Sequence, residues 1–178
     1  MKKCTRINKV SGEEKNVGRL IEIIIRVIAH LLYPINIWKL KQMAQSGNIV
    51  FRTAYFEKMK KMGSYIGPDT EFATMPQFPH GILGVVIAGD AKIGKNCIIY
   101  HNVTIGKKTI GENLQEEGKN FKAPVIGNNV FIGAGAIILG DVHIGDNCKI
   151  GAGSVVTHDV PDNSIVVSQP VKIIPSSR

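Results

Sequence analysis

The sequence lacks the cysteine pattern of a disulfide-stabilised protein. Its three cysteines, Cys4, Cys97 and Cys148, form no CxxC pair and no even set. Its N-terminus lacks the successive charged, apolar and small-residue zones of a secretory signal. Both absences argue against a secreted disulfide scaffold, so we expect a reducing, cytoplasmic location.

Composition excludes disorder and a collagen-like fibre. The 178-residue chain is 44% hydrophobic and 20% charged, which is ordinary for a folded protein. Its 19 glycines do not recur at every third position, as a triple helix requires. Glycine is favoured where the backbone turns tightly, so these glycines are expected in turns. The turns must recur for a reason other than a triple helix.

The positive charge is concentrated in one part of the chain. Residues 1–62 carry 13 Lys and Arg against 4 Asp and Glu, whereas residues 63–178 carry 9 against 10. The basic character of the protein, with its net charge of +8, therefore belongs to an N-terminal appendage. We expect no nucleic-acid partner.

Aliphatic residues recur at a period of six along the second part of the chain. The positions are Ile87, Ile93, Ile99 and Ile105, then Ile126, Ile132, Ile138, Ile144, Ile150 and Val156. A glycine directly follows many of them, and a small residue or valine often lies four positions on. An amphipathic helix repeats at about 3.6 residues and a half-buried strand at about 2, so neither element explains the pattern.

A period of six predicts a parallel β-helix and hence a mainly β fold. Each repeat forms a short strand and a turn on one side of a triangular prism, and three sides close a coil of about 18 residues. The aliphatic side chains point inward and stack on the next coil at the strand spacing of about 4.8 Å. Ile66, Phe72 and Phe78 keep the same spacing before a three-residue slip to Ile87, so the prism begins near Tyr65.

The repeat divides the chain into segments. We expect an N-terminal helical segment at 1–62, a β-helix domain at 63–164 and a C-terminal cap or tail at 165–178. The cap is expected because a solenoid needs one to cover its open end. Within the β-helix, 21 residues separate Ile105 from Ile126, which predicts an extruded loop at 107–123. Long loops are usually functional or disordered, and we favour a lid or an arm that reaches another subunit.

Residues 18–62 are predicted to be helical. Apolar residues surround most of a helix from Leu20 to Leu32, which Pro34 ends. This helix is short for a membrane span, so its apolar surface is expected either to pack on another subunit or to lie on the inner face of a membrane. We favour packing. The stretch from Val50 to Met62 is predicted to be a solvated basic helix end.

His80 and His101 are the histidines that the repeat brings together. They lie two residues after Phe78 and Ile99, which fall on the same side of successive coils. Two imidazoles at strand spacing suit a general base and an orienting partner, although two unrelated surface histidines are the alternative. The remaining histidines, His30, His143 and His158, are expected to be structural or solvated.

Small residues continue this side of the prism. The next coils carry IGAGA at 132–136 and IGAGS at 150–154. Tiny residues leave a shallow track where an extended ligand can approach the backbone, although turn-forming glycines would give the same pattern. Sites are expected on outer surfaces where subunits meet, because aliphatic side chains fill the prism. Cys97 and Cys148 occupy the small inward position, which indicates core residues rather than nucleophiles.

Three segments of the repeat region are specific enough to indicate a family. They are PHGILGVVI at 79–87, AKIGKNCIIYHNVTIG at 91–106 and VIGNNVFIGAGAIILGDVHIGDNCKIGAGSVVTHDVP at 125–161. Over residues 64–172 the chain resembles the hexapeptide-repeat acyltransferases, most closely their serine acetyltransferase-like branch. The resemblance implies a left-handed β-helix that forms a homotrimer, or a dimer of trimers, with acetyl-CoA as co-substrate in the groove between subunits. It implies no metal.

The resemblance also implies roles for single residues. His80 would remove the proton from an acceptor hydroxyl as its oxygen attacks the thioester, with His101 as the supporting residue that the repeat suggests. A backbone or side-chain donor would stabilise the tetrahedral oxyanion. The positions that match residues flanking CoA are Gly106, Ala134, Lys149 and Ala152, of which Lys149 suits a phosphate.

Several positions depart from the serine acetyltransferase pattern. Tyr65 replaces the aspartate that orients the catalytic histidine, Pro79 replaces an acceptor-binding aspartate, and Ala123 replaces a second active-site histidine. His101 stands where glutamine is usual, and SQP at 168–170 replaces G-x-P. We therefore expect the hydroxyl of a sugar or polysaccharide precursor as acceptor, and a role in polysaccharide biosynthesis. L-Serine is the alternative acceptor.

Two hypotheses from other classes remain. A γ-carbonic-anhydrase-like zinc protein on the same prism needs three histidines that converge across a subunit interface, whereas only His80 and His101 share a side. A non-catalytic scaffold would bind no CoA.

Overall fold

A computed structural model of the protein describes residues 23–24, 27–28, 36–107 and 122–168. The chain divides into two compact units, Met1–Lys58 and Met59–Arg178. The three-part domain division made from the sequence stays a prediction.

The first unit contains helices whose starts are fixed by asparagine caps. Helix α2 spans Ile37–Gln45, and helix α3, which begins in this unit, spans Ile49–Lys61. The side chain of Asn36 accepts a hydrogen bond from the backbone N–H of Trp38 at 2.9 Å, and Asn48 accepts one from Val50 at 2.9 Å. Each cap satisfies an N–H that the first helical turn leaves without a partner. The predicted helix at Val50 to Met62 is present, but it is not solvated throughout, because Ala54, Tyr55 and Met59 are buried.

The apolar helix expected at residues 20–32 lies mostly outside the described residues. Residues 23–24 and 27–28 are described and helical, and the side chains of Ile23 and Val27 are exposed. Among the residues that the structure describes, no helix is both long and apolar enough to span a membrane.

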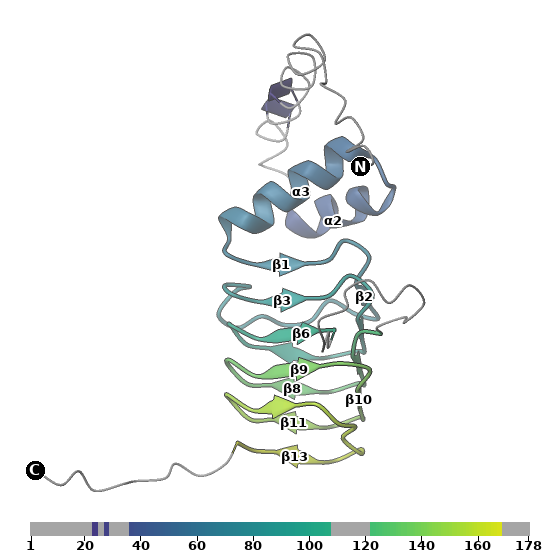
Figure 1. Ribbon diagram of the computed structural model, residues 1–178, viewed down its shortest axis with the longest axis vertical. Coiled ribbons are helices and arrows are strands. Elements are labelled where there is room, and N and C mark those ends of the chain that lie inside the picture. Colours follow the sequence, from purple (N-terminus) through teal and green to yellow (C-terminus); the bar gives the residue numbers. More distant parts are fainter. Residues whose placement is uncertain (1–22, 25–26, 29–35, 108–121, 169–178) are drawn as a thin grey trace, which may run out of the picture. The chain divides into compact units, whose positions relative to one another are not determined.

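The second unit is a left-handed parallel β-helix, as the repeat predicts. Its short strands stack in Figure 1 and build three parallel sheets. The first sheet contains β1 (Tyr65–Ile66), β3 (Val86–Ile87), β6 (Thr104–Gly106), β9 (Ile137–Leu139) and β12 (Val155–Val156). The second contains β2 (Glu71–Phe72), β4 (Lys92–Ile93), β7 (Val125–Ile126) and β10 (His143–Ile144). The third contains β5 (Ile98–Ile99), β8 (Phe131–Ile132), β11 (Lys149–Ile150) and β13 (Ile165–Val166).

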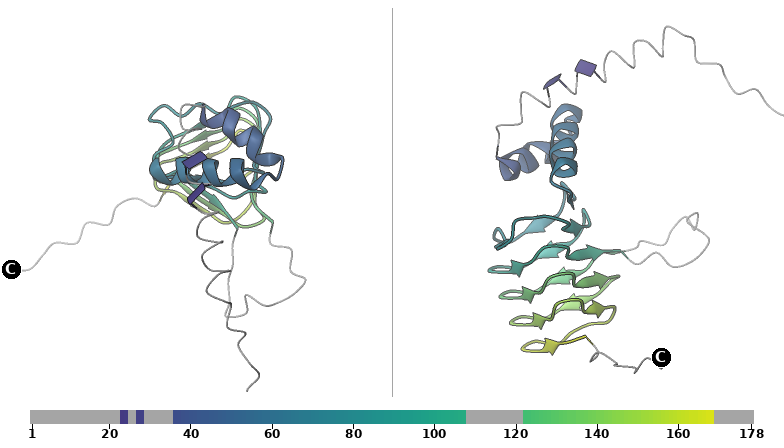
Figure 2. Two further views of the ribbon diagram at one scale, coloured as in Figure 1. Left: turned by 90° about the horizontal axis from the view of Figure 1, so that it is seen from above. Right: turned by 90° about the vertical axis from the view of Figure 1, so that its left-hand side faces the viewer.

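The register of the sheets stacks the repeat residues in the core. Ile87 pairs with Ile105, which pairs with Ile138, and all three are 0% exposed. Ile66 pairs with Ile87, so the predicted three-residue slip between the first two coils is present. Burying aliphatic side chains of this size supplies roughly 1.5–3 kcal/mol each, which makes the core the main stabilising feature of the unit. Figure 2 shows the successive coils of this unit from two further directions.

The sheets of the β-helix continue across the predicted loop and past residue 164. Most of the predicted loop 107–123 lies outside the described residues, but the sheet register resumes after it as expected, with Ile93 paired to Ile126. Strand pairing extends past residue 164, since β13 pairs with β11. The last coil is two residues shorter than 18, with Ile150 opposite Val166. Val166 therefore does not fall on the six-residue period of the sequence.

Candidate active site

The candidate site lies along one corner of the β-helix, where the third sheet leads into the first. We call it the histidine corner; it comprises the turns at 79–85, 100–103, 133–136 and 151–154. Backbone hydrogen bonds connect successive turns: Asn102 N–H donates to Leu83 at 2.9 Å, Gly135 to His101 at 3.1 Å, and Gly153 to Ala134 at 2.9 Å. The turns therefore form one continuous column.

The corner brings His80 and His101 into direct contact. Their Nδ1 atoms are 3.0 Å apart, and their ring centroids are 5.0 Å apart. His80 is exposed and lies in a tight turn, where Gly81 N–H donates to Phe78 C=O at 2.9 Å; His101 is half-buried. The two histidines are thus neighbours on the outer surface, and their catalytic roles stay predictions.

Tyr100 is a site residue that the sequence analysis missed. Its ring meets that of His80 at 5.1 Å between centroids and 82° between planes, an edge-to-face contact. Tyr100 also packs on Phe131, with ring centroids 5.3 Å apart. The repeat could have indicated Tyr100, because it directly follows the inward Ile99 and so falls on the outer side beside His101.

Two of the predicted CoA-flanking residues continue the same column. Ala134 is half-buried and Ala152 is exposed, each in the turn after an inward isoleucine. The neighbouring Gly135 and Gly153 have φ angles of +69° and +67°, which disfavour other residues. A Cβ at either glycine would meet no atom within 4 Å, so the corner is open in the two coils that follow the coil of His101. This arrangement suits the shallow track that the sequence predicts.

Lys149 lies beside this column on the outer surface of the third sheet. It pairs with Phe131 in the register, its side chain is exposed, and Phe131 contacts Tyr100. Lys149 therefore offers a cation on the surface that adjoins the histidine corner.

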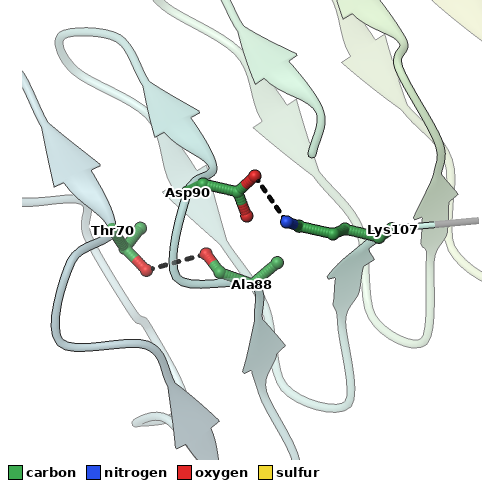
Figure 3. A network of polar contacts seen from close by, with 4 residues as sticks. All are labelled: Thr70, Ala88, Asp90 and Lys107. Atoms are coloured by element: carbon green, nitrogen blue, oxygen red, sulfur yellow. Dashed lines mark hydrogen bonds and ion pairs between the residues drawn. The ribbon is translucent and has the colours of Figure 1, made fainter. Parts of the chain in front are cut away.

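Gly106 is not brought to the histidine corner. It ends β6 at a different corner, where the first sheet leads into the second. Figure 3 shows that corner: Lys107 Nζ lies 2.8 Å from Asp90, and the hydroxyl of Thr70 donates to Ala88 C=O at 2.9 Å. Within one chain, Gly106 and His80 thus belong to different surfaces.

The other candidate residues have structural surroundings. Cys97 and Cys148 are buried in the core, and burial raises the pKa of the Cys97 thiol. His143 is exposed on β10, and the ring of exposed His158 lies 3.1 Å from the Thr157 hydroxyl. Among the described residues, no group of three or more His, Cys, Asp or Glu side chains is arranged to hold a metal ion. His30 lies outside the described residues.

The chain is similar to a transferase family and to several serine acetyltransferases. The pattern of the bacterial transferase hexapeptide family (six repeats) matches residues 123–158. The serine acetyltransferase of Staphylococcus xylosus is 38% identical over 148 residues, which are 83% of this chain and 60% of that protein. The serine acetyltransferase of Synechococcus elongatus is 45% identical over 95 residues, or 53% of this chain and 36% of that protein. The chain thus spans less than two thirds of the length of each of these relatives.

Solved structures give the same result. Serine acetyltransferase isoform 3 of Entamoeba histolytica, in complex with cysteine, superposes with a TM-score of 0.65 and 30% identity over 79% of this chain and 49% of that one. Soybean serine acetyltransferase, complexed with serine, superposes with a TM-score of 0.59 and 34% identity over 82% of this chain and 53% of that one.

These relatives correct the expected acceptor. We expected a saccharide because Tyr65, Pro79 and Ala123 replace family residues, and that expectation, with its role in polysaccharide biosynthesis, is wrong: the relatives named above are serine acetyltransferases. Three replaced positions are weaker grounds than 38% identity over 83% of the chain. The chain belongs to the hexapeptide-repeat acyltransferase family, in its serine acetyltransferase-like branch.

Proposed function

We propose that this protein is a serine O-acetyltransferase, which transfers the acetyl group of acetyl-CoA to the hydroxyl of L-serine. The observation that carries the proposal is the 38% identity to a serine acetyltransferase over 83% of the chain. The exposed imidazole of His80, above an open column of small residues, supports it as a place where a hydroxyl and a thioester could meet.

His80 acts as the general base in the proposed reaction. The serine hydroxyl oxygen attacks the carbonyl carbon of the thioester while its proton passes to a ring nitrogen of His80. The carbon–sulfur bond then breaks, and the same proton passes to the CoA sulfur. The products are O-acetyl-L-serine and CoA with a free thiol, and His80 returns to its starting state.

Ala134 and Ala152 are proposed to form the floor on which CoA lies, with Lys149 contacting a phosphate. Their small side chains suit this role because larger ones would fill the open side of the corner. Replacing Ala152 by leucine should raise the KM for acetyl-CoA at least about tenfold. The leucine side chain would occupy space in which the CoA molecule is proposed to lie. The matched control is Ala73→Leu, at an exposed turn after β2 on a different corner, which should leave the KM unchanged. Equal KM values in both variants would refute the track.

The proposed assembly is a homotrimer with its sites between subunits. The outward residues of the first sheet are mainly apolar, and Val86 and Val155 on it are 40% and 62% exposed. The second sheet instead carries a Lys92–Glu71 ion pair at 3.2 Å. Packing across the first sheet would bury apolar area and bring another copy to the histidine corner. It would also let Gly106 act from a neighbouring subunit.

The trimer is tested by sedimentation velocity. Val155→Glu should shift the protein towards monomer, because it puts a charge into the proposed interface. Val125→Glu on the second sheet, beside Lys92, is the control and should sediment as the wild type does. A monomeric wild-type protein would rule out the assembly.

Product identification tests the function. The purified protein is incubated with acetyl-CoA and L-serine, and the products are separated and weighed by mass spectrometry. We expect O-acetyl-L-serine to accumulate with CoA in equal amounts. CoA release without an acetylated serine would refute serine as the acceptor.

A further inference from the structure

The contact between His80 and His101 joins two nitrogens of the same kind. Their Nδ1 atoms are 3.0 Å apart, a hydrogen-bond distance. A hydrogen bond needs one donor and one acceptor, and a neutral imidazole carries its proton on only one of its two nitrogens. One ring must therefore be protonated on Nδ1 and the other on Nε2. As a result, only one of the two Nε2 atoms has a free lone pair at any time.

The surroundings of the rings favour one of the two arrangements. His80 is exposed at its turn, whereas His101 is half-buried in the column, where its C=O accepts from Gly135. A substrate hydroxyl approaches from solvent, so a useful base needs its lone pair on the exposed ring. That lone pair is on Nε2 of His80 only if His80 donates its Nδ1–H to His101.

We propose that His101 is the positioning residue for His80: it accepts the Nδ1–H of His80 through its own Nδ1 and so keeps the basic lone pair on His80 Nε2. The proposal rests on the proposed function for its kinetic consequences. No carboxylate among the described residues contacts either ring. The neutral imidazole of His101 therefore takes the place of an acidic side chain as the acceptor of the His80 Nδ1–H.

Tyr100 restricts the ring of His80 from a second direction. Its edge-to-face contact at 5.1 Å, backed by Phe131, opposes a flip of the imidazole about its χ2 angle. A flip would exchange Nδ1 for Cδ2, which cannot donate to His101, and would also exchange Nε2 for Cε1. The two contacts together fix the ring plane and the tautomer.

The proton balance of the pair follows directly. The hydroxyl proton adds to Nε2 of His80, which becomes an imidazolium and still donates its Nδ1–H to the neutral His101. The pair then carries one positive charge, which is lost when the proton passes to the CoA sulfur. The hydrogen bond shortens and strengthens while His80 is charged, so His101 stabilises the state that forms during the reaction.

Nuclear magnetic resonance tests the tautomers without any acceptor. In protein labelled with ¹⁵N-histidine, long-range ¹H–¹⁵N correlations at about pH 8.5, above the usual histidine pKa of about 6.5, report which nitrogen carries the proton. We expect Nδ1–H in His80 and Nε2–H in His101. In His101→Leu, His80 should lose its Nδ1–H signature, whereas the control His143→Gln should leave both rings unchanged. A wild-type His80 protonated on Nε2 would overturn the proposal.

Kinetics with two substitutions provide the second test. His101→Leu should lower kcat about 10- to 100-fold, as expected for losing a hydrogen bond to a charged group, and leave the KM for acetyl-CoA unchanged. His101→Gln, whose amide oxygen can still accept, should recover most of that loss. Equal defects in the two variants, or a wild-type kcat in the leucine variant, would refute the role of His101. If the wild type does not acetylate serine but the tautomers are as stated, the proposed function fails and the pairing stands.

Discussion

Replacing Asn129 by alanine should destabilise the β-helix without changing catalysis. Asn129 belongs to a column of four asparagines with positive φ angles of 56° to 60°, at the corner where the second sheet leads into the third: Asn96, Asn129, Asn147 and Asn163. The side chain of Asn129 accepts from Asn96 at 3.3 Å and donates to Asn147 at 3.1 Å. It therefore joins three successive coils.

The size of the effect follows from two terms. A residue with a Cβ pays roughly 1–2 kcal/mol in the left-handed region, and asparagine tolerates it better than alanine does. Each of the two exposed side-chain hydrogen bonds contributes about 0.5 kcal/mol, the low end of the usual range. Asn129→Ala should therefore cost about 2 kcal/mol, or roughly 4–8 °C in Tm for a chain of this size. Asn129→Gly loses the same bonds but not the backbone preference, so it should cost about 1 kcal/mol.

The assay is urea unfolding of the three proteins at one fixed protein concentration, followed by circular dichroism. Acetyl transfer is measured in parallel and should be unchanged, because this corner is not the histidine corner. Equal stability of the alanine and glycine variants would show that the left-handed backbone contributes nothing. Equal stability of all three would show that the column itself does not hold the coils together.

Two further predictions concern single polar groups. Ser154 is 1% exposed, and its hydroxyl has no hydrogen-bond partner among the described residues, so Ser154→Ala should leave the free energy of unfolding unchanged or raise it by up to about 1 kcal/mol; a clear loss in urea unfolding would contradict this. The backbone and side-chain amides of Asn128 lower the pKa of Asp146 below its ordinary 3.8, so its contribution to stability is present above pH 3.8 and is lost as the pH falls further. Asp146→Asn should flatten the dependence of the urea midpoint on pH between about 3 and 5, and an unchanged dependence would refute the linkage.

Much of the fold could be predicted because the repeat is a local signal. A period of six places Ile87, Ile105 and Ile138 on one side of successive coils, and the register pairs them as expected. The same period predicts that His80 lies beside His101, and the structure places their Nδ1 atoms 3.0 Å apart. Large aliphatic side chains at fixed spacing leave few other ways to form a core.

The remaining features depend on interactions that periodicity does not encode. The last coil is shorter by two residues, and a change of phase at its turn concealed the pairing of Ile150 with Val166. Repeat position places Tyr100 on the outer side beside His101, but its ring contact with His80 depends on side-chain directions at the corner. Gly106 was predicted to flank CoA because the chain resembles a family that assembles into trimers. Within one chain, Gly106 lies at a different corner of the prism from His80. The expected saccharide acceptor was wrong because Tyr65, Pro79 and Ala123 are three positions in a chain that is similar to a serine acetyltransferase over 83% of its length.

The most direct test of the account is the rate of thiol release from acetyl-CoA with L-serine as the only acceptor, compared between wild type and His80→Ala. Binding of CoA to each protein is measured by calorimetry as the control for folding. The account predicts a rate at least about 100-fold lower in the variant, because general base catalysis contributes roughly 10²–10⁴-fold, with CoA affinity unchanged. A His80→Ala variant that releases thiol at the wild-type rate would contradict it.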